Sequence, residues 1–251
     1  MTDFVHAFNG DTKISVQGIR EIKTAATTNL GSVKPLGQGR EVVYAKLSTA
    51  AHSSAMVAGA VMIAPAALAN HMQRAAAQTA SIGARAVFLV IGATSAVKDQ
   101  YAGGLLHISS GAGSGYSYMI DGHQAWAASA TAAKVLLKDG LEVALTTASI
   151  CNLIPNLYRD VVISTNCAAK TAIPVGVLLK SAALTNGGYT YLGKKGVWPA
   201  AIEGTELTGM QLVLGSAPGT LTVMNTATLT FSICGKCVVT GQATALVNFD
   251  L

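Results

Sequence analysis

Short apolar segments separated by turn residues run along most of the chain, and this pattern predicts a protein made mainly of β-strands. From Tyr101 onward, segments such as LLHISS, YSYMIDG, LEVALTT and VGVLLKSA are rich in Val, Ile, Leu, Thr and Tyr. Gly, Asn, Asp and Pro separate them at intervals of roughly 8–12 residues, which is typical of a β-sandwich or β-barrel. Long helical segments do not alternate with these strands, so a doubly wound α/β sheet is not expected.

The N-terminal half has a less regular pattern. Residues 1–46 contain strand-like stretches and turn signals, and we expect them to form an N-terminal arm or a strand-containing extension. Residues 47–251 are expected to form the main β domain, with two β subdomains as an alternative. Between two apolar strand-like stretches, the segment from Pro65 to Gln78 is rich in Ala and begins with Pro, which predicts a short helix.

Composition adds that the surface is poor in charge. Apolar residues make up 51% of the chain and charged residues 12%, about half the usual share of charge. Such a chain is globular, because disorder requires low hydrophobicity and high charge. So little charge indicates a subunit of an assembly, in which partners bury part of the surface; a charge-poor monomer is the alternative.

The distribution of charge and the pattern of the N-terminus argue against nucleic-acid and membrane partners. The net charge is +5, but the basic residues are scattered and the densest cluster is the pair Lys194-Lys195. A nucleic-acid-binding protein is expected to show a basic stripe with aromatic partners, so no specific nucleic acid is predicted. The N-terminus lacks a signal-peptide pattern, and the apolar stretch from Ala55 to Asn70 is broken by Pro65 and too short to span a bilayer. We therefore expect a soluble protein that is made in a cytosol with reduced thiols and has no membrane partner.

The pair Cys234 and Cys237 raises the question of redox or metal chemistry. A structural zinc ion needs four ligands, and Cys151 and Cys167 do not offer a second close pair. A thioredoxin-like site needs the motif at a helix start, whereas the flanking residues here indicate strands on either side of a Gly-Lys turn or bulge. The sequence therefore predicts structural or incidental thiols, with no metal and no cofactor.

Other chemical motifs also favour a structural interpretation. Gly111–Tyr116 lacks the last glycine of the dinucleotide fingerprint and precedes a strand, which predicts a hairpin turn. Asp121 lies near His123, but Asp-Gly is a turn pair, and no Gly-x-Ser-x-Gly motif is present. Glu203 and Glu206 are expected to be solvated. No catalytic residue is predicted, and the chain is not expected to be an enzyme.

An aromatic stretch, GGYTYLGKKGVWPA, is the best candidate for binding. Tyr189 and Tyr191 share one face of a predicted strand, and Lys194, Lys195 and Trp198 follow them. Tyr and Trp are enriched at interfaces, so these five residues are a possible contact surface with a partner or another subunit. Core packing of the rings is the alternative interpretation.

Several segments together resemble structural proteins of tailed bacteriophages. They include QYAGGLLHISSGAGSGYSYMIDGHQA, VLLKDGLEVALTTASICNLIPNLYRDVVIS, TAIPVGVLLKSAALTNGGYTYLGKKGVWPAAIEG and MQLVLGSAPGT, within about residues 40–215. The set is similar to head decoration (cement) proteins, which bind the outside of an icosahedral capsid. The two lysines in GGYTYLGKKGVWPA and the C-terminal CGKC depart from the pattern of that family, so the resemblance does not indicate which residues form the interface.

This resemblance implies a non-enzymatic virion protein made in the bacterial host cytoplasm and placed on the capsid exterior. Its expected partners are the major capsid protein and further copies of itself. A trimer is favoured because closed cyclic symmetry suits local three-fold positions. The alternatives are another phage component, such as a head-fibre base or tail protein, and a Cys-dependent or metal-binding enzyme.

Overall fold

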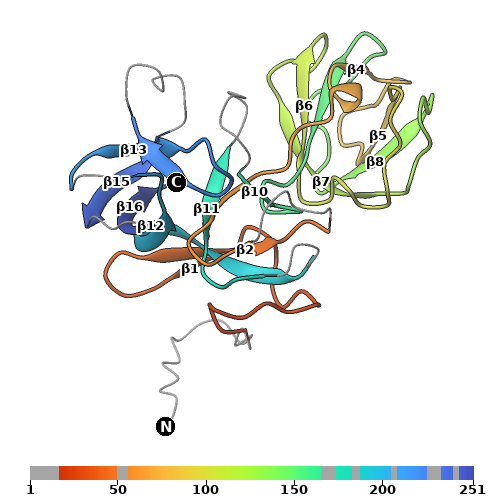
Figure 1. Cartoon of the computed structure of the whole chain (residues 1–251). Helices are drawn as coiled ribbons and strands as arrows, with labels where there is room; N and C mark the ends of the chain where they lie inside the picture. Colours follow the sequence, from red (N-terminus) through yellow and green to blue (C-terminus); the bar gives the residue numbers. More distant parts are fainter. Residues whose placement is uncertain are drawn as a thin grey trace.

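The computed structural model describes residues 17–49, 56–164, 173–182, 187–204, 208–224, 233–239 and 243–251. Within these ranges the chain forms antiparallel sheets arranged in two lobes (Figure 1). This confirms that the fold is mainly β, with curled sheets as the pattern of short strands predicts. No helix in the described part of the chain is long and apolar enough to cross a membrane.

The larger lobe, called the sheet lobe, contains a ten-stranded sheet. Its strands are β1 (Val33–Pro35), β2 (Glu41–Lys46), β3 (Val61–Ile63), β10 (Val162–Ile163), β11 (Pro174–Leu178), β12 (Tyr189–Ala201), β13 (Gln211–Leu214), β14 (Leu221–Val223), β15 (Ile233–Val239) and β16 (Thr244–Asp250). The order along the sheet is β10-β3-β11-β12-β16-β15-β13-β14, and the hairpin β1–β2 pairs with β12. A bridge between Ile202 and Leu221 brings β14 back to the end of β12, so this part of the sheet curls toward closure.

The smaller lobe, called the barrel lobe, contains six strands in the order β4-β9-β6-β7-β8-β5. They are β4 (Arg74–Ala75), β5 (Ala86–Leu89), β6 (Leu105–Ser110), β7 (Ser117–His123), β8 (Ala133–Leu137) and β9 (Ile150–Ile154). A bridge between Ala76 and Leu89 joins the two ends of this path, and the Ala77 N–H donates to Phe88 O at 2.7 Å. The sheet is therefore a near-closed barrel.

The barrel lobe is inserted into the sheet lobe. The chain leaves the sheet lobe after β3 and returns at β10, and these two strands pair with each other at Ile63 and Val162. The returning segment contacts both lobes: Lys46 Nζ lies 2.7 Å from Asp160 Oδ1, and the Arg159 guanidinium donates to the Asp99 carbonyl of the barrel lobe. The entry and exit of the insertion are thus neighbours, as expected for a module placed in a loop.

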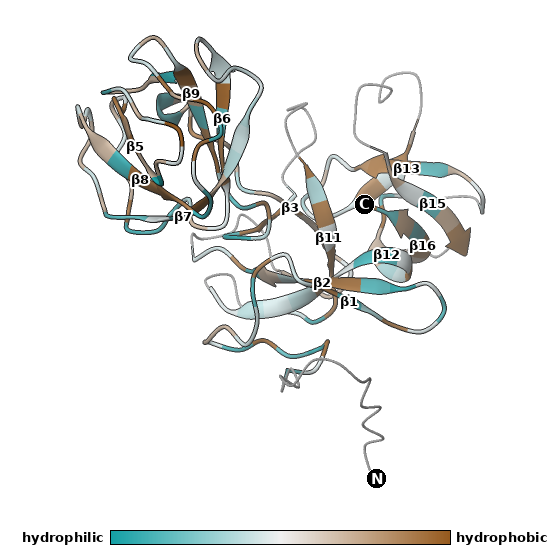
Figure 2. Cartoon of the chain, turned by 180° about the vertical axis from the view of Figure 1, so that it is seen from behind, coloured by the Kyte–Doolittle hydropathy of each residue, from teal (hydrophilic) through white to brown (hydrophobic). Residues whose placement is uncertain are grey.

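Three hydrophobic clusters stabilise the two lobes, and Figure 2 shows apolar residues along the strands of each lobe. One cluster fills the barrel, and two belong to the sheet lobe. Along β2, Val42 and Tyr44 belong to one of these two clusters, while Val43 and Ala45 belong to the other. Strand β2 is therefore buried on both faces, which explains its continuous apolar run.

The short helix predicted from Pro65 to Gln78 is not confirmed. This segment contains only the 3-10 helix η1 (Ala69–His71), and β4 follows it. Gln73 has φ of 53°, which interrupts any helix, and the Ala76 N–H donates to Ser149 O at 3.0 Å. Pairing with the neighbouring strands outweighs the helix propensity of the alanines, because intrinsic propensity is only a weak preference.

The glycine-rich segment after β6 forms the turn that its sequence predicts. Gly111, Gly113 and Gly115 have φ values of 79°, 81° and 91° and connect β6 to β7. A side chain at any of these positions would be strained in this left-handed conformation. The segment is thus a hairpin connection that leads into a strand, unlike a dinucleotide-binding loop, which opens a helix.

Candidate functional site

All five predicted contact residues lie on β12, the longest strand of the sheet lobe. The first part of β12 pairs with β2, and its last part pairs with β16. Lys195 stands where these partners meet, opposite Glu41 on one side and Asp250 on the other. Strand β12 therefore ties the N-terminal hairpin to the C-terminal strand, and its two faces have different surroundings.

Two of the five side chains belong to the core of the sheet lobe. Tyr191 is 2% exposed and Trp198 is 3% exposed, and both pack in the same cluster as Phe249. The Trp198 indole Nε1–H donates to Lys195 O at 2.8 Å. A Cβ at Gly193 would lie 2.8 Å from the indole ring, so glycine is required for the ring to pack there. For these two rings, the structure shows core packing within the chain.

A cation lies over each of these two rings. Arg40 Cζ lies 5.3 Å from the centre of the Trp198 ring, and Lys34 Nζ lies 5.9 Å from the centre of the Tyr191 ring. These distances suit cation–π contacts. Long basic side chains can cover apolar surface while their charged ends stay in water. The cations of the β1–β2 hairpin thus separate the aromatic core from solvent.

The other three candidate residues reach the surface. Tyr189 and Lys194 are half-buried, and Lys195 is exposed. Lys195 Nζ lies 3.9 Å from Asp250 Oδ1, which is a weak, solvent-screened pair. A contact of this stretch with a partner stays a prediction, and within this chain Tyr189 already has a different role.

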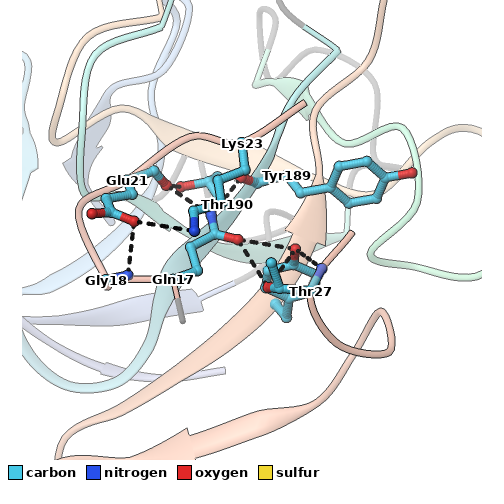
Figure 3. A network of polar contacts seen from close by, with 8 residues as sticks. Gln17, Gly18, Glu21, Lys23, Thr27, Tyr189 and Thr190 are labelled. Atoms are coloured by element: carbon cyan, nitrogen blue, oxygen red, sulfur yellow. Dashed lines mark hydrogen bonds and ion pairs between the residues drawn. The ribbon is translucent and has the colours of Figure 1, made fainter. Parts of the chain in front are cut away.

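Tyr189 helps to hold the N-terminal segment of its own chain, as Figure 3 shows. The buried Gln17 side chain donates from Nε2 to Tyr189 O at 2.7 Å and to Glu21 O at 3.0 Å. Its Oε1 accepts from the Tyr44 hydroxyl at 3.0 Å. Thr27 Oγ1 lies 3.1 Å from both Gln17 Oε1 and the Tyr44 hydroxyl and can donate to either. One glutamine side chain therefore joins the N-terminal segment to β2 and β12.

Backbone and ring contacts extend this network. Lys23 and Tyr189 exchange two backbone hydrogen bonds, of 2.9 and 2.7 Å, and Thr190 Oγ1 donates to Glu21 O at 2.9 Å. The Tyr44 ring stacks on Tyr189 with centroids 6.1 Å apart. Sequence reasoning missed this role because Gln17 and Tyr189 are 172 positions apart. No local motif in the sequence indicates that Gln17 is buried.

The Cys-x-x-Cys pair lies inside β15. Cys234 and Cys237 are both buried in the main cluster of the sheet lobe. The pairing with β13 skips from Ile233 to Gly235, so a bulge occurs at Cys234, and the Gly-Lys pair is not a turn. The bulge explains how residues three apart reach the same core, because a regular strand would point them to opposite faces.

The chemistry of these thiols is that of core side chains. Burial raises the pKa of the Cys234 thiol to about 12 and that of the Cys151 thiol to about 11. A reactive cysteine needs a lowered pKa, because the thiolate is the nucleophile and the metal ligand. Among the described residues, no group of three His, Cys, Asp or Glu side chains is placed to hold a metal ion. Cys167 lies outside the described residues.

The barrel lobe contains a buried polar cluster that the sequence did not reveal. His71 Nδ1 lies 2.5 Å from the Tyr101 hydroxyl, and His71 Nε2 lies 2.9 Å from Thr94 O. His123 Nε2 accepts from the Tyr101 N–H at 3.1 Å, and His123 Nδ1 lies 2.7 Å from Gln124 O. Both nitrogens of each ring are therefore engaged, so these histidines support the loops around them.

Acidic and basic groups border this cluster. Asp99 Oδ1 accepts from the His123 N–H at 2.9 Å, so His123 is anchored by Asp99 and not by Asp121, its neighbour in sequence. A depression of about 340 Å³ lies beside them, lined by Lys98, Asp99, Asp121, Gly122, His123, Gln124, Lys134 and Leu136. Burial lowers the pKa of His123 and raises that of Tyr101 to about 12. Both groups are thus neutral at pH 7.

Glu203, which the sequence placed at the solvated surface, holds a turn of the sheet lobe. Its carboxylate accepts from the Ala217 N–H, from the Thr220 hydroxyl at 2.5 Å and from the Ser216 hydroxyl at 3.0 Å. Partial burial raises the pKa of Glu203, but these hydrogen bonds outweigh that effect and lower it. Glu206 lies outside the described residues.

Comparison with known proteins adds no further constraint. No protein-family model, no curated protein and no solved structure matches the chain.

Proposed function

We propose that the protein is a virion structural protein: a decoration, or cement, protein on the outside of a tailed-bacteriophage capsid. In this proposal it is made in the host cytoplasm, associates with itself, binds the lattice of the major capsid protein and stabilises the head. The resemblance of its β segments to such proteins supports the phage assignment. Its role is mechanical, and no residue is assigned to catalysis.

One structural observation carries the proposal of an assembly subunit. Both lobes expose apolar side chains on regular strands, including Leu105 and Met119 of the barrel lobe and Val239 and Leu246 of the sheet lobe. The solvated face of an antiparallel sheet normally carries polar residues. Exposed apolar side chains gathered on strand faces are typical of surfaces that other proteins cover.

The energetics of a shell suit a subunit of this kind. Burial of apolar surface contributes about 25 cal/mol per Å², and each association costs translational and rotational freedom. A modest contact is therefore weak when it occurs once. When the same contact is repeated over a symmetric shell, its contributions add and raise the temperature at which the shell opens.

Heads assembled without this protein provide the test. Purified full-length protein is added to such heads, and its copy number, its position and the heat tolerance of the particles are measured by quantitative gel analysis, electron microscopy and calorimetry. We expect copies over the whole head lattice and a higher disruption temperature. Copies confined to one vertex or to the tail would support the head-fibre or tail alternative, and an absence of binding would overturn the proposal.

A further inference from the structure

The outward face of β12, β16 and β15 forms an apolar strip. Pro199 of β12 lies directly opposite Leu246 of β16, which in turn lies opposite Val239 of β15. Leu246 is 40% exposed, Val239 is 50% exposed, and Pro199 is also exposed. This row, called the outer strip, therefore crosses three neighbouring strands without a polar side chain.

The opposite face of the same strands is the core of the sheet lobe. Trp198 and Val247 are the chain neighbours of Pro199 and Leu246, and a bulge in β15 between Cys237 and Val239 turns Cys237 inward. All three inward residues belong to the buried cluster. Burial of that inner face already stabilises these strands, so packing within the chain does not account for the apolar outer strip. Val197 and Val238, each 37% exposed, widen the strip on β12 and β15.

We propose that the outer strip packs against the same strip of a second copy of this chain, around a two-fold axis. This inference deepens the self-association included in the proposed function and rests on it, and it proposes a dimer in place of the trimer that the resemblance implies. The two-fold axis lies in the interface and runs across the strands, along the row of Pro199, Leu246 and Val239. Each of these residues then faces the same residue of the other copy, as in aligned sheets packed face to face.

Polar groups on the central strand match this arrangement. Thr244 and Asn248 lie two residues before and two residues after Leu246 on the exposed face of β16. The two-fold axis therefore sets Asn248 of one copy against Thr244 of the other. An amide and a hydroxyl can each donate and accept, so both groups can find a partner across the interface.

The charges near the strip also suit a second copy. Lys195, Lys236 and Asp250 are exposed and lie on the Asn248 side of Leu246. A two-fold axis through Leu246 places the Asn248 side of one copy over the Thr244 side of the other copy. Like charges are thus kept apart, while the uncharged strip forms the centre, as in interfaces with an apolar core and a polar rim.

The mass of the full-length protein in solution tests the contact. The chain has a mass of 25.5 kDa, and sedimentation with light scattering should show a concentration-dependent dimer. Leu246→Lys should weaken dimerisation by about tenfold or more, because it puts two cations against each other at the axis. Met119→Lys is the matched control: it changes an exposed apolar strand residue of the barrel lobe and should leave the dimer intact.

A charge-pair rescue tests the register and does not depend on Leu246. Asn248→Lys alone and Thr244→Asp alone should each weaken the dimer. The double variant should restore it to within a few-fold of the wild type, because each lysine then faces an aspartate of the other copy. Circular dichroism establishes that each variant is folded.

Three outcomes would overturn the inference: a wild-type monomer, a trimer, or a dimer that Leu246→Lys leaves intact, whatever the effect of Met119→Lys. A double variant that is no better than the single variants would overturn the two-fold register. Binding to heads is measured separately. Protein that coats heads but stays monomeric contradicts this inference and the self-association, but not the decoration role, whereas protein that dimerises but does not bind heads contradicts the decoration role.

Discussion

The barrel lobe and the sheet lobe are both made of curled antiparallel strands, but they are assembled from the chain in different ways. The barrel lobe comes from one continuous stretch, and its buried polar cluster joins residues 71 to 126. The sheet lobe comes from the two stretches on either side of it, and its network joins Gln17 to Tyr189. Contacts distant in sequence slow folding, so we expect the barrel lobe to form first.

The two polar networks also differ in charge chemistry. The network of the barrel lobe contains two imidazoles whose ring nitrogens are all engaged. In the sheet lobe, Gln17 connects the hydroxyl groups of Tyr44 and Thr27. Protonation of His123 under acidic conditions can therefore disturb the first network directly, whereas Gln17 carries no titratable group. Acidification should separate the lobes more clearly than heat does.

The largest expected effect comes from removing one tryptophan in each lobe. Trp198→Ala should lower the free energy of unfolding of the sheet lobe by about 3–5 kcal/mol, because it leaves a cavity in the core. Trp126→Ala should lower the stability of the barrel lobe in the same way, because the centroid of this ring lies 4.0 Å from that of the His123 ring. Calorimetry with hydrogen exchange should assign each loss to its own lobe. If both variants shift one common transition, the lobes unfold as a unit and the comparison fails.

The second effect concerns the N-terminal segment. Gln17→Ala removes the acceptor of the Tyr44 hydroxyl and two hydrogen bonds to backbone carbonyls. Those carbonyls keep the Lys23 N–H and the Thr190 hydroxyl as donors, so the cost is that of the lost bonds, about 0.5–1.5 kcal/mol for each. Exchange of the amides in residues 17–27 should accelerate. Thr24→Ala, at an exposed position in the same segment, is the control. Equal exchange in both variants would mean that Gln17 does not hold the segment.

The sequence predicts the features that neighbouring residues determine, and it misses those that depend on contacts between residues far apart in the chain. The alternation of apolar and polar residues and the glycines at 111, 113 and 115 act locally, and from them the β class and the hairpin turn were predicted correctly. The helix from Pro65 to Gln78 was a wrong prediction, because its alanines pair with strands distant in sequence. The insertion and both polar networks depend on contacts that no local pattern records.

The candidate site shows the same limit at the level of single residues. A period of two correctly places Tyr189 and Tyr191 on one strand, but it cannot say which face of β12 is the core. The bulge at Cys234 is also invisible to that period, although a turn or bulge was among the alternatives. Only the three-dimensional pairing shows that Trp198 faces inward while Val197 and Pro199 face outward.

The third effect is a dependence on pH that belongs to the barrel lobe. Burial lowers the pKa of His123; Arg159 and His71 act in the same direction, while the bond to Gln124 O and the charge of Asp99 oppose it. The unfolded chain takes up a proton near pH 6.5, whereas folded His123 resists it. Stability is therefore complete above that pH and falls as the pH decreases toward the folded pKa.

His123→Gln tests this effect, because its amide can still accept from the Tyr101 N–H and does not titrate. The variant should make the stability of the barrel lobe nearly independent of pH between about 7 and 5, as measured by urea unfolding. His107→Gln is the control, since His107 is only half-buried and bonds to Ser117 near the surface. An unchanged pH profile in His123→Gln would assign the dependence to another group.

The smallest effect belongs to Glu203 and completes the comparison at lower pH. Its hydrogen bonds to Thr220, Ala217 and Ser216 lower its pKa, so its contribution is present above the unfolded value of about 4.3 and is lost as the pH falls below it. Solvent screening keeps this contribution small. Glu203→Gln should remove this acid-induced loss, while Glu142→Gln should not. We therefore expect acidification to weaken the barrel lobe first, through His123, and the 215–220 turn of the sheet lobe later; amide exchange showing the reverse order would contradict the assignment of these two groups.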